Sequence, residues 1–333
     1  MNKKNILKTV ISLTFIFTSL LACNTDKHEN DVYDNYATVD YISGKGVLDF
    51  YVSPDDEVYY ICHYPYNLNA INLSIRKIDV NGNVIVIQPD NDVLGFNPVI
   101  AGSNNENIYF IAHYTTSQNI YEYVTSSSTT NIYPMPYPLF HIEYFRDETY
   151  IISDSSKVLR FDPALGTASI IAGSGTSSIV DGIGINASFE YISKIYVKDE
   201  IIYVIDGSFD GYIYGNNIRK IEKVGSDFIV STLVSNYPYS FKDISVNDSG
   251  ELFVLVREQG KGIYKLNNSD NSLEEYLTGF LNYKNKKNNQ NYYYSQDWFS
   301  IDGFAIKSDD LYLLNDDQEV IKIPDYERQF NLY

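Results

Sequence analysis

The amino-acid sequence predicts an all-β protein, and within that class a six-bladed β-propeller made of four-stranded antiparallel blades. Three observations support this prediction. The 333 residues include 32 Tyr and 17 Phe but only 2 Met, and aromatic residues are enriched in strands. A characteristic pair of strands recurs six times along the chain. Short turns rich in Asn, Asp and Gly precede most of these pairs, which is typical of β-hairpins.

The recurring unit begins with a short strand that carries an aromatic residue. These strands are expected at residues 58–61, 108–111, 149–152, 202–205, 252–255 and 311–314. An aliphatic strand follows each one, at 75–78, 120–123, 158–161, 218–221, 263–266 and 320–323. The aromatic positions are separated by 50, 41, 53, 50 and 59 residues. Steps of this size fit one four-stranded blade each, so six copies predict six blades.

The order of the strands also predicts how the ring closes. Only ten residues follow the last recurring strand at 320–323, which leaves little length for another strand. We therefore expect the segment 37–46, before the first repeat, to complete the sixth blade. Such a closure removes an exposed sheet edge.

The N-terminal segment has the layout of an export signal. Two lysines follow Met1, and an apolar run from Ile6 to Leu21 is too short to span a bilayer comfortably. The run ends in Leu20-Leu21-Ala22-Cys23, which resembles the lipobox of bacterial lipoproteins. The resemblance implies cleavage before Cys23, acylation of Cys23 and a place in the cell envelope, facing the periplasm or the exterior, with the outer membrane expected. The alternatives are an ordinary signal peptide and an uncleaved anchor.

These signals divide the chain into three parts. Residues 1–22 are expected to form the signal peptide, residues 23–36 a polar tether, and residues 37–333 the propeller. Loss of the signal peptide leaves 22 basic and 43 acidic residues, a net charge of −21. A surface this acidic repels nucleic acid, so we expect no nucleic-acid partner. Cys62 is the only other cysteine, which excludes a disulfide framework.

The fourth repeat resembles an NHL repeat, a unit found in six-bladed propellers of the TolB-like superfamily. A Gly-rich turn at 172–175 precedes Asp181-Gly182-Ile183-Gly184, and an apolar strand at 195–197 follows. The strand ending in Asp206 and the strand containing Arg219 complete the pattern. The Pro expected after Phe189 is absent, and the other five repeats keep only the strand pattern. The resemblance therefore bears on the fold and says little about the function.

Several tyrosines lie in loops that a propeller of this kind gathers on one face. Tyr and Trp offer large, stiff contact surfaces that suit a glycan or a protein partner. The alternative is that these loops simply cover the ring. The candidate ligand-binding residues are Tyr64, Tyr66, Tyr133, Tyr137, Tyr237, Tyr239, Tyr293 and Trp298, the last two in a long insert from Asn282 to Trp298.

Polar residues recur four positions after the aromatic positions and are expected to ring the mouth of the same face. They are His63, His113, Asp154, Arg257 and Asp316, with Gly207 in the fourth repeat. His63 and His113 are candidate metal ligands. The alternative is that they hydrogen-bond to neighbouring groups, and we assign neither a metal nor any other cofactor.

The inner strands are expected to place Asp49, His141, Lys194, Asp243 and Asp302 around the channel. Six-bladed lactonases hold Ca²⁺ at this level with Glu, Asn and Asp. Here the ring contains a lysine and lacks a clear set of acids, so the resemblance does not extend to their site.

The sequence contains no phosphate-binding loop, no G-x-S-x-G motif and no basis for a Ser-His-Asp triad. The favoured hypothesis is a non-catalytic, membrane-anchored module that binds a glycan or a protein. The alternatives are a metal-dependent hydrolase or lyase at the propeller mouth, and a scaffold in an envelope assembly.

Overall fold

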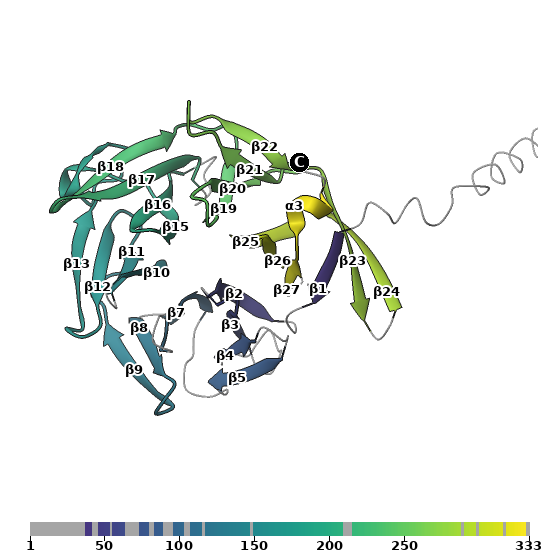
Figure 1. Ribbon diagram of the computed structural model, residues 1–333. Coiled ribbons are helices and arrows are strands. Elements are labelled where there is room, and N and C mark those ends of the chain that lie inside the picture. Colours follow the sequence, from purple (N-terminus) through teal and green to yellow (C-terminus); the bar gives the residue numbers. More distant parts are fainter. Residues whose placement is uncertain are drawn as a thin grey trace, which may run out of the picture.

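Six β-sheets stand around a common axis, as the computed structural model shows (Figure 1). The structure describes residues 37–41, 46–53, 55–63, 73–79, 83–88, 96–102, 107–114, 117–146, 149–208, 215–287, 290–297, 300–315 and 318–330. The prediction of a six-bladed propeller with four-stranded antiparallel blades is confirmed. The predictions for residues 1–36, including the lipidation of Cys23, lie outside the described residues.

The first three blades follow the chain in order, each running from an inner strand at the axis to an outer strand at the rim. Blade 1 contains β2 (Val47–Val52), β3 (Val58–His63), β4 (Leu73–Ile78) and β5 (Val84–Gln88). Blade 2 contains β6 (Phe96–Ala101), β7 (Ile108–Tyr114), β8 (Ser117–Val124) and β9 (Thr129–Pro134). Blade 3 contains β10 (His141–Arg146), β11 (Thr149–Ser153), β12 (Val158–Asp162) and β13 (Thr167–Ala172).

The next two blades repeat this order. Blade 4 contains β15 (Ile192–Lys198), β16 (Ile201–Asp206), β17 (Asn217–Val224) and β18 (Asp227–Val234). Its outer edge also carries the short strand β14 (Gly182–Ile183), which is followed by the 3₁₀ helix η1 (Gly184–Asn186). Blade 5 contains β19 (Ser240–Val246), β20 (Leu252–Arg257), β21 (Ile263–Leu266) and β22 (Leu273–Leu277).

The sixth sheet differs from the others because it takes strands from both ends of the chain. From the axis outward it contains β25 (Ile301–Lys307), β26 (Asp310–Asn315), β27 (Val320–Ile323), β1 (Ala37–Tyr41), β23 (Phe280–Lys287) and β24 (Gln290–Asp297). Strand β1 pairs antiparallel with β27, opposite Lys322 and Ile321, and parallel with β23 on its other side. The short helix α3 (Tyr326–Gln329) follows β27.

The long insert expected as a loop over the face is a β-hairpin instead, which corrects the sequence-based expectation. Strands β23 and β24 pair from Phe280 with Asp297 to Lys287 with Gln290. They lie beyond β1 at the rim of the sixth sheet (Figure 1). A paired hairpin satisfies backbone N–H and C=O groups that an irregular loop would leave to water. Tyr293 belongs to β24, its side chain lies outside the described residues, and so does Trp298.

The hydrophobic core lies between neighbouring blades. Six clusters of buried residues each join two adjacent sheets, and the last one joins blade 6 to blade 1 through Tyr312 and Tyr60. Cys62 belongs to the same cluster, and its thiol donates a 3.6 Å hydrogen bond to the carbonyl oxygen of Ser74. Every pair of neighbouring blades therefore shares buried apolar surface, the main favourable contribution to folding.

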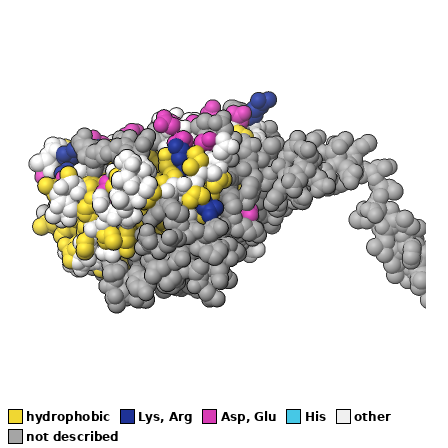
Figure 2. All heavy atoms as spheres, turned by 90° about the horizontal axis from the view of Figure 1, so that it is seen from below, with side chains coloured by type: hydrophobic (Ala, Val, Ile, Leu, Met, Phe, Trp, Pro, Cys, Tyr) yellow, Lys and Arg dark blue, Asp and Glu magenta, His cyan; other side chains and the backbone are white. Residues whose placement is uncertain are grey.

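The surface of the ring carries both polar and hydrophobic side chains. Acidic side chains gather along one rim of the ring in an edge-on view, and hydrophobic side chains show between polar ones on the edge itself (Figure 2). Outer strands contribute apolar residues to this edge, among them Val86, Ile132 and Ile170. Scattered apolar residues of this kind are usual on protein surfaces.

Candidate functional site

The inner strands of all six blades surround a cavity of about 560 Å³ on the axis of the ring. Both apolar or aromatic side chains and charged side chains line the cavity. The acidic, basic and histidine lining residues are Asp49, His141, Glu143, Lys194, Lys242, Asp243, Asp302 and Lys307. The axial cavity is the candidate functional site because it concentrates charged groups in a concave space on the axis of the ring.

A β-bulge that recurs in the inner strands sets the direction of their side chains. A β-bulge interrupts the pairing of β2, β15, β19 and β25 with their neighbours. The first residue paired after each bulge is Asp49, Lys194, Asp243 and Gly303, respectively. Bulges change the direction of a side chain and are common beside functional sites. The four strands thus bring equivalent positions to the same level of the channel.

Two of the carboxylates hold neighbouring blades together. Asp49 Oδ2 accepts a 2.9 Å hydrogen bond from the N–H of Ile100 in blade 2. Asp243 Oδ2 accepts one of the same length from the N–H of Phe304 in blade 6. A Cβ atom at Gly303 would lie 3.2 Å from Asp243 Oδ2, so the glycine leaves room for this contact.

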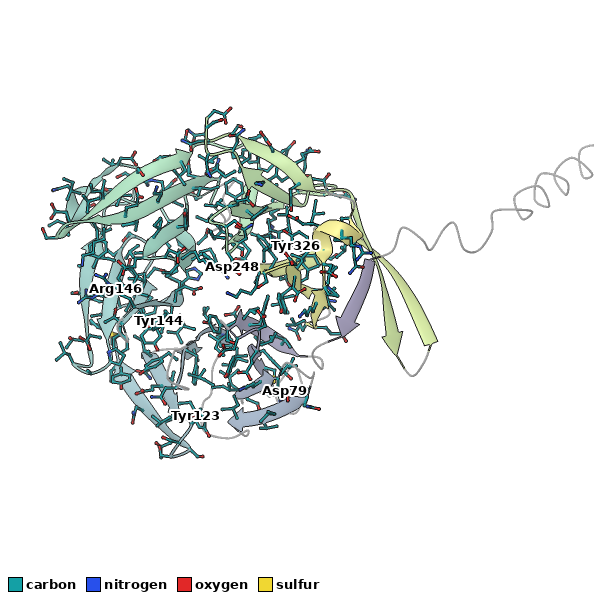
Figure 3. The ribbon with its side chains drawn as sticks, in the orientation of Figure 1. Asp79, Tyr123, Tyr144, Arg146, Asp248 and Tyr326 are labelled. Atoms are coloured by element: carbon teal, nitrogen blue, oxygen red, sulfur yellow. The ribbon has the colours of Figure 1, made fainter. Side chains whose placement is uncertain are left out.

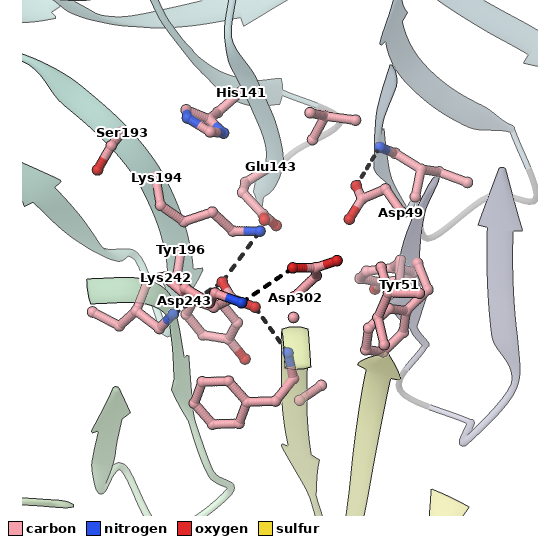
Figure 4. A pocket seen from close by; sticks show the side chains of 18 of the residues that line it. Asp49, Tyr51, His141, Glu143, Ser193, Lys194, Tyr196, Lys242, Asp243 and Asp302 are labelled. Atoms are coloured by element: carbon pink, nitrogen blue, oxygen red, sulfur yellow. Dashed lines mark hydrogen bonds and ion pairs between the residues drawn. The ribbon is translucent and has the colours of Figure 1, made fainter. Parts of the chain in front are cut away.

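The lysines of the cavity pair with only part of its carboxylates (Figure 4). Lys194 Nζ lies 3.2 Å from Asp243 Oδ1. Lys242 Nζ lies 3.2 Å from Asp302 Oδ1 and donates a 2.8 Å hydrogen bond to the carbonyl oxygen of Ile301. Glu143 points toward Lys194, but it makes no hydrogen bond or ion pair within the described part of the chain. Asp49 likewise has no lysine or arginine within ion-pair distance there.

The enclosure of the cavity changes the acidity of these groups. Burial raises the pKa of Glu143 to about 8, although Lys194 opposes the shift, and Asp49 and Asp243 add to it. Burial raises the pKa of Asp49 to about 6 in the same way. Desolvation alone would lower the pKa of Lys194, but the carboxylates of Asp243, Asp49 and Glu143 hold it above its usual value. The Lys194 side chain keeps 25% of its surface exposed, so water in the channel reaches the cluster.

Aromatic side chains complete the walls. Phe140 and Tyr191 lie at the end of the channel where the inner strands begin, with ring centroids 6.0 Å apart. They precede β10 and β15, the strands that carry Glu143 and Lys194. Deeper in the channel, the Tyr196 hydroxyl donates a 3.3 Å hydrogen bond to the carbonyl oxygen of Val246, and burial raises the pKa of Tyr196 to about 12.

Sequence reasoning found most of this cavity. Asp49, His141, Lys194, Asp243 and Asp302 were expected around the channel, and all five line it. Glu143 and Lys242 were not expected. Glu143 follows His141 by two residues, and side chains two apart share one side of a strand, so this spacing was the available signal. With Glu143 added, the cavity is lined by four carboxylates, Asp49, Glu143, Asp243 and Asp302, together with three lysines.

Asp154 and Arg257, two of the residues expected at the propeller mouth, lie one strand farther from the axis. Asp154 directly follows β11, where its Oδ1 accepts hydrogen bonds of 2.7 and 2.6 Å from the N–H groups of Ser156 and Lys157. Arg257 ends β20. Neither residue is among those that line the cavity. The side chains of His63 and His113, and all of Asp316, lie outside the described residues. Within the described ranges, no group of three or more His, Cys, Asp and Glu residues is arranged to hold a metal ion.

The described members of the aromatic face are half-buried in the packing between blades. The Tyr133 hydroxyl donates a 2.7 Å hydrogen bond to Glu122 Oε2. The Tyr237 ring stacks on Phe241 with centroids 5.2 Å apart, and Tyr239 packs against the same cluster. Tyr137 packs against the cluster between blades 2 and 3. These contacts suit the covering role that was the alternative to binding. Tyr64 and Tyr66 lie outside the described residues.

No helix among the described residues combines the length and apolar character needed to cross a bilayer.

Comparisons with known proteins show the fold and no closer relationship. No family model matches the chain, and no curated protein sequence matches it. Virginiamycin B lyase from Staphylococcus aureus is 12% identical, with a TM-score of 0.53 over 86% of this chain and 97% of the lyase. A protein of unknown function from Bacteroides thetaiotaomicron is also 12% identical, with a TM-score of 0.54 over 86% of this chain and 72% of its own. YCF48 bound to D1 peptide is 10% identical, with a TM-score of 0.52 over 86% and 96% of the two chains. Together with the six sheets described above, these neighbours show that the chain has a six-bladed β-propeller fold.

Proposed function

We propose that this protein is a non-catalytic binding propeller, anchored to a membrane through lipid on Cys23 and exposed outside the cytoplasm. It takes a segment of a protein partner at the axial cavity. The observation that carries this proposal is the cavity itself, which all six inner strands line and whose charged groups are only partly paired with one another. Binding sites are concave, largely apolar and marked by a few convergent polar groups.

A polypeptide is the favoured ligand class. The structure of YCF48 with D1 peptide illustrates that a propeller of similar fold binds a peptide. The net charge of −21 without the signal peptide disfavours nucleic acid and anionic headgroups. A glycan, the other ligand considered, is favoured by planar aromatic platforms, and the described tyrosines of the aromatic face are half-buried in packing contacts.

The binding role is tested with the full chain, purified from membranes in detergent, on arrays of short peptides and of glycans. Ser193 lines the cavity, so Ser193→Trp should obstruct it. We expect the wild type to bind peptides and Ser193→Trp to lose binding at least tenfold, about 1.4 kcal/mol. Thr129→Trp, on the exposed outer strand β9, is the matched control and should bind as the wild type does. Binding of glycans alone, or no effect of Ser193→Trp, would contradict the proposal.

The anchor and the closure of the ring belong to the same proposal. The apolar run that ends at Cys23 supports lipidation, and the pairing of β1 with β27 supports closure by the N-terminal strand. Cells grown with labelled palmitate should label the wild type, and Cys23→Ser should abolish the label and release the chain from membranes. Cys62→Ser is the control and should keep both properties, because that thiol is buried in the core.

The two rival functions have their own readouts. Stoichiometric Zn²⁺ or Ca²⁺ in the purified chain, lost in a His63→Ala, His113→Ala double variant, would favour a metal-dependent hydrolase or lyase. A stable complex that survives Ser193→Trp would favour a scaffold that docks through another surface.

A further inference from the structure

The charges inside the axial cavity are unequal in number and unequally paired. Asp243 and Asp302 each lie 3.2 Å from a lysine Nζ, and the third lining lysine, Lys307, pairs with Asp248 at the end of the channel. Asp49 has a backbone N–H as partner. Glu143 has neither a hydrogen bond nor an ion pair among the described residues. An enclosed carboxylate without a partner is unfavourable, so such a group either holds a proton or binds a cation.

The route to these carboxylates suits a long basic side chain. Phe140 and Tyr191 come from adjacent blades and lie at the end where the inner strands begin. Aromatic faces attract ammonium and guanidinium groups, and the methylene stems of Lys and Arg pack on apolar surfaces. Farther along the inner strands, Glu143 and Asp49 face the channel from β10 and β2 (Figure 4). The aromatic pair is a second observation, independent of the carboxylates, that points to a cationic ligand.

We propose that the axial cavity takes a Lys or Arg side chain of the protein partner, with its charged end against Glu143 and Asp49 and its stem beside Phe140 and Tyr191. This inference rests on the proposed binding function and names the chemistry of the ligand. A neutral side chain would form no ion pair with Glu143 or Asp49, and an acidic one would be repelled by the ionised Asp49, so the same groups select against other residues.

Binding of a cation must displace a proton. At pH 7 the carboxyl of Glu143 is largely protonated, because burial raises its pKa to about 8. A cation placed beside it favours the ionised form, so binding should release about one proton per ligand. The charged or titratable groups facing Glu143 across the cavity are Asp49 and Tyr51 from β2, His141 from its own strand, Lys194 and Tyr196 from β15, Lys242 and Asp243 from β19, and Asp302 and Lys307 from β25.

The test is isothermal titration calorimetry of the full chain in detergent with three blocked pentapeptides, made of glycine around a central lysine, arginine or norleucine. Norleucine keeps the length of the lysine stem and removes its charge. We expect the lysine or the arginine peptide to bind at least tenfold more tightly than the norleucine peptide at pH 7. Titrations in phosphate and in Tris, which differ in ionisation enthalpy, should show the release of about one proton.

Variants show whether Glu143 is responsible. Glu143→Gln should weaken the binding of the basic peptide at least tenfold and remove most of the proton release. Glu222→Gln is the matched control, since Glu222 is a half-buried residue of β17 outside the cavity whose side chain keeps 43% of its surface exposed, and it should change neither. Equal affinity for the norleucine peptide, or an unchanged proton release in Glu143→Gln, would overturn the proposal. If array peptides bind at the cavity without preference for basic residues, the binding function stands and this inference falls. If no peptide binds in either experiment, both fall.

Discussion

Glu143 and Asp243 are both carboxylates on inner strands, and their surroundings give them different roles. Asp243 is buried, pairs with Lys194 and accepts the N–H of Phe304, so it connects two blades and balances a charge. Glu143 has no such contacts among the described residues. Its burial raises its pKa to about 8, so its charge changes near neutral pH.

The raised pKa of Glu143 predicts that stability depends on pH. Between about pH 4.5 and 8 the folded chain holds a proton on Glu143 that the unfolded chain has lost, so stability falls as pH rises through this window. Glu143→Gln should remove that fall and should stabilise the chain at pH 8.5 by roughly 1–2 kcal/mol, a figure reduced for the water in the channel. Urea unfolding at pH 5.5 and 8.5 measures the difference. If stability changed with pH by the same amount in the wild type and in Glu143→Gln, this prediction would be contradicted. Glu222→Gln is the control.

At the scale of the element, the residues of blade 4 that resemble an NHL repeat form one network around the buried side chain of Arg219. Arg219 is fully buried, and its guanidinium lies 2.7 Å from Asp206 Oδ2 and 2.8 Å from Asp181 Oδ1. Asp181 also accepts hydrogen bonds from the N–H and hydroxyl of Thr232 in β18. Asp206 accepts the N–H groups of Glu190 and Tyr191. The network ties the Gly-rich segment before β15 to the strands of its own blade. The motif therefore has a structural role.

Removing the arginine should strongly destabilise the chain. Arg219→Met leaves Asp206 buried without its cation, and breaking a buried pair in this way costs about 3–5 kcal/mol. Urea unfolding at pH 7 measures the loss, and Lys220→Met, at the adjacent, partly exposed position, should change stability far less.

The pH dependence separates this effect from lost packing. Burial already raises the pKa of Asp206, and loss of Arg219 should raise it further. Stability lost in Arg219→Met should therefore be partly regained as the pH falls and Asp206 becomes protonated. A loss that is the same at pH 4.5 and pH 7 would indicate packing alone.

At the scale of the whole molecule, the ring depends on contacts between blades. Six apolar clusters join neighbouring sheets, and Asp248 in a turn of blade 5 adds a polar connection near the axis (Figure 3). Its Oδ1 lies 2.9 Å from Lys198 Nζ of blade 4 and 3.2 Å from Lys307 Nζ of blade 6, and its Oδ2 accepts the N–H of Ser308. One carboxylate thus connects three blades. The hydrogen bond from Lys198 is the main reason that its pKa is lowered to about 2.

Neutralising the carboxylate of Asp248 should slightly lower the stability of the ring. Asp248 is 42% exposed, so Asp248→Asn should lower stability by only about 1 kcal/mol at pH 7, and by less in high salt. Because the pKa is depressed in the folded state, the contribution is present above about pH 4 and is lost as the pH falls toward 2. Thermal unfolding at pH 7 and pH 2.5 measures this, with Asp227→Asn, at the exposed first residue of β18, as control. A difference as large at pH 2.5 as at pH 7 would indicate a cause other than charge.

The sequence by itself determined the blades and most of the channel. Repeated strands and turns depend on local contacts. The six aromatic positions therefore marked the second strand of each of the six blades, and their spacing placed Lys194 and Asp243 on inner strands. The hairpin β23–β24 was not predicted as strands, because its pairing with β1 joins residues more than 200 positions apart. The convergence of Asp49, Glu143 and Asp243 around Lys194 was decided by the closed ring alone. Their chemistry depends on distances across the axis and on exclusion of water, and neither is encoded in any single strand.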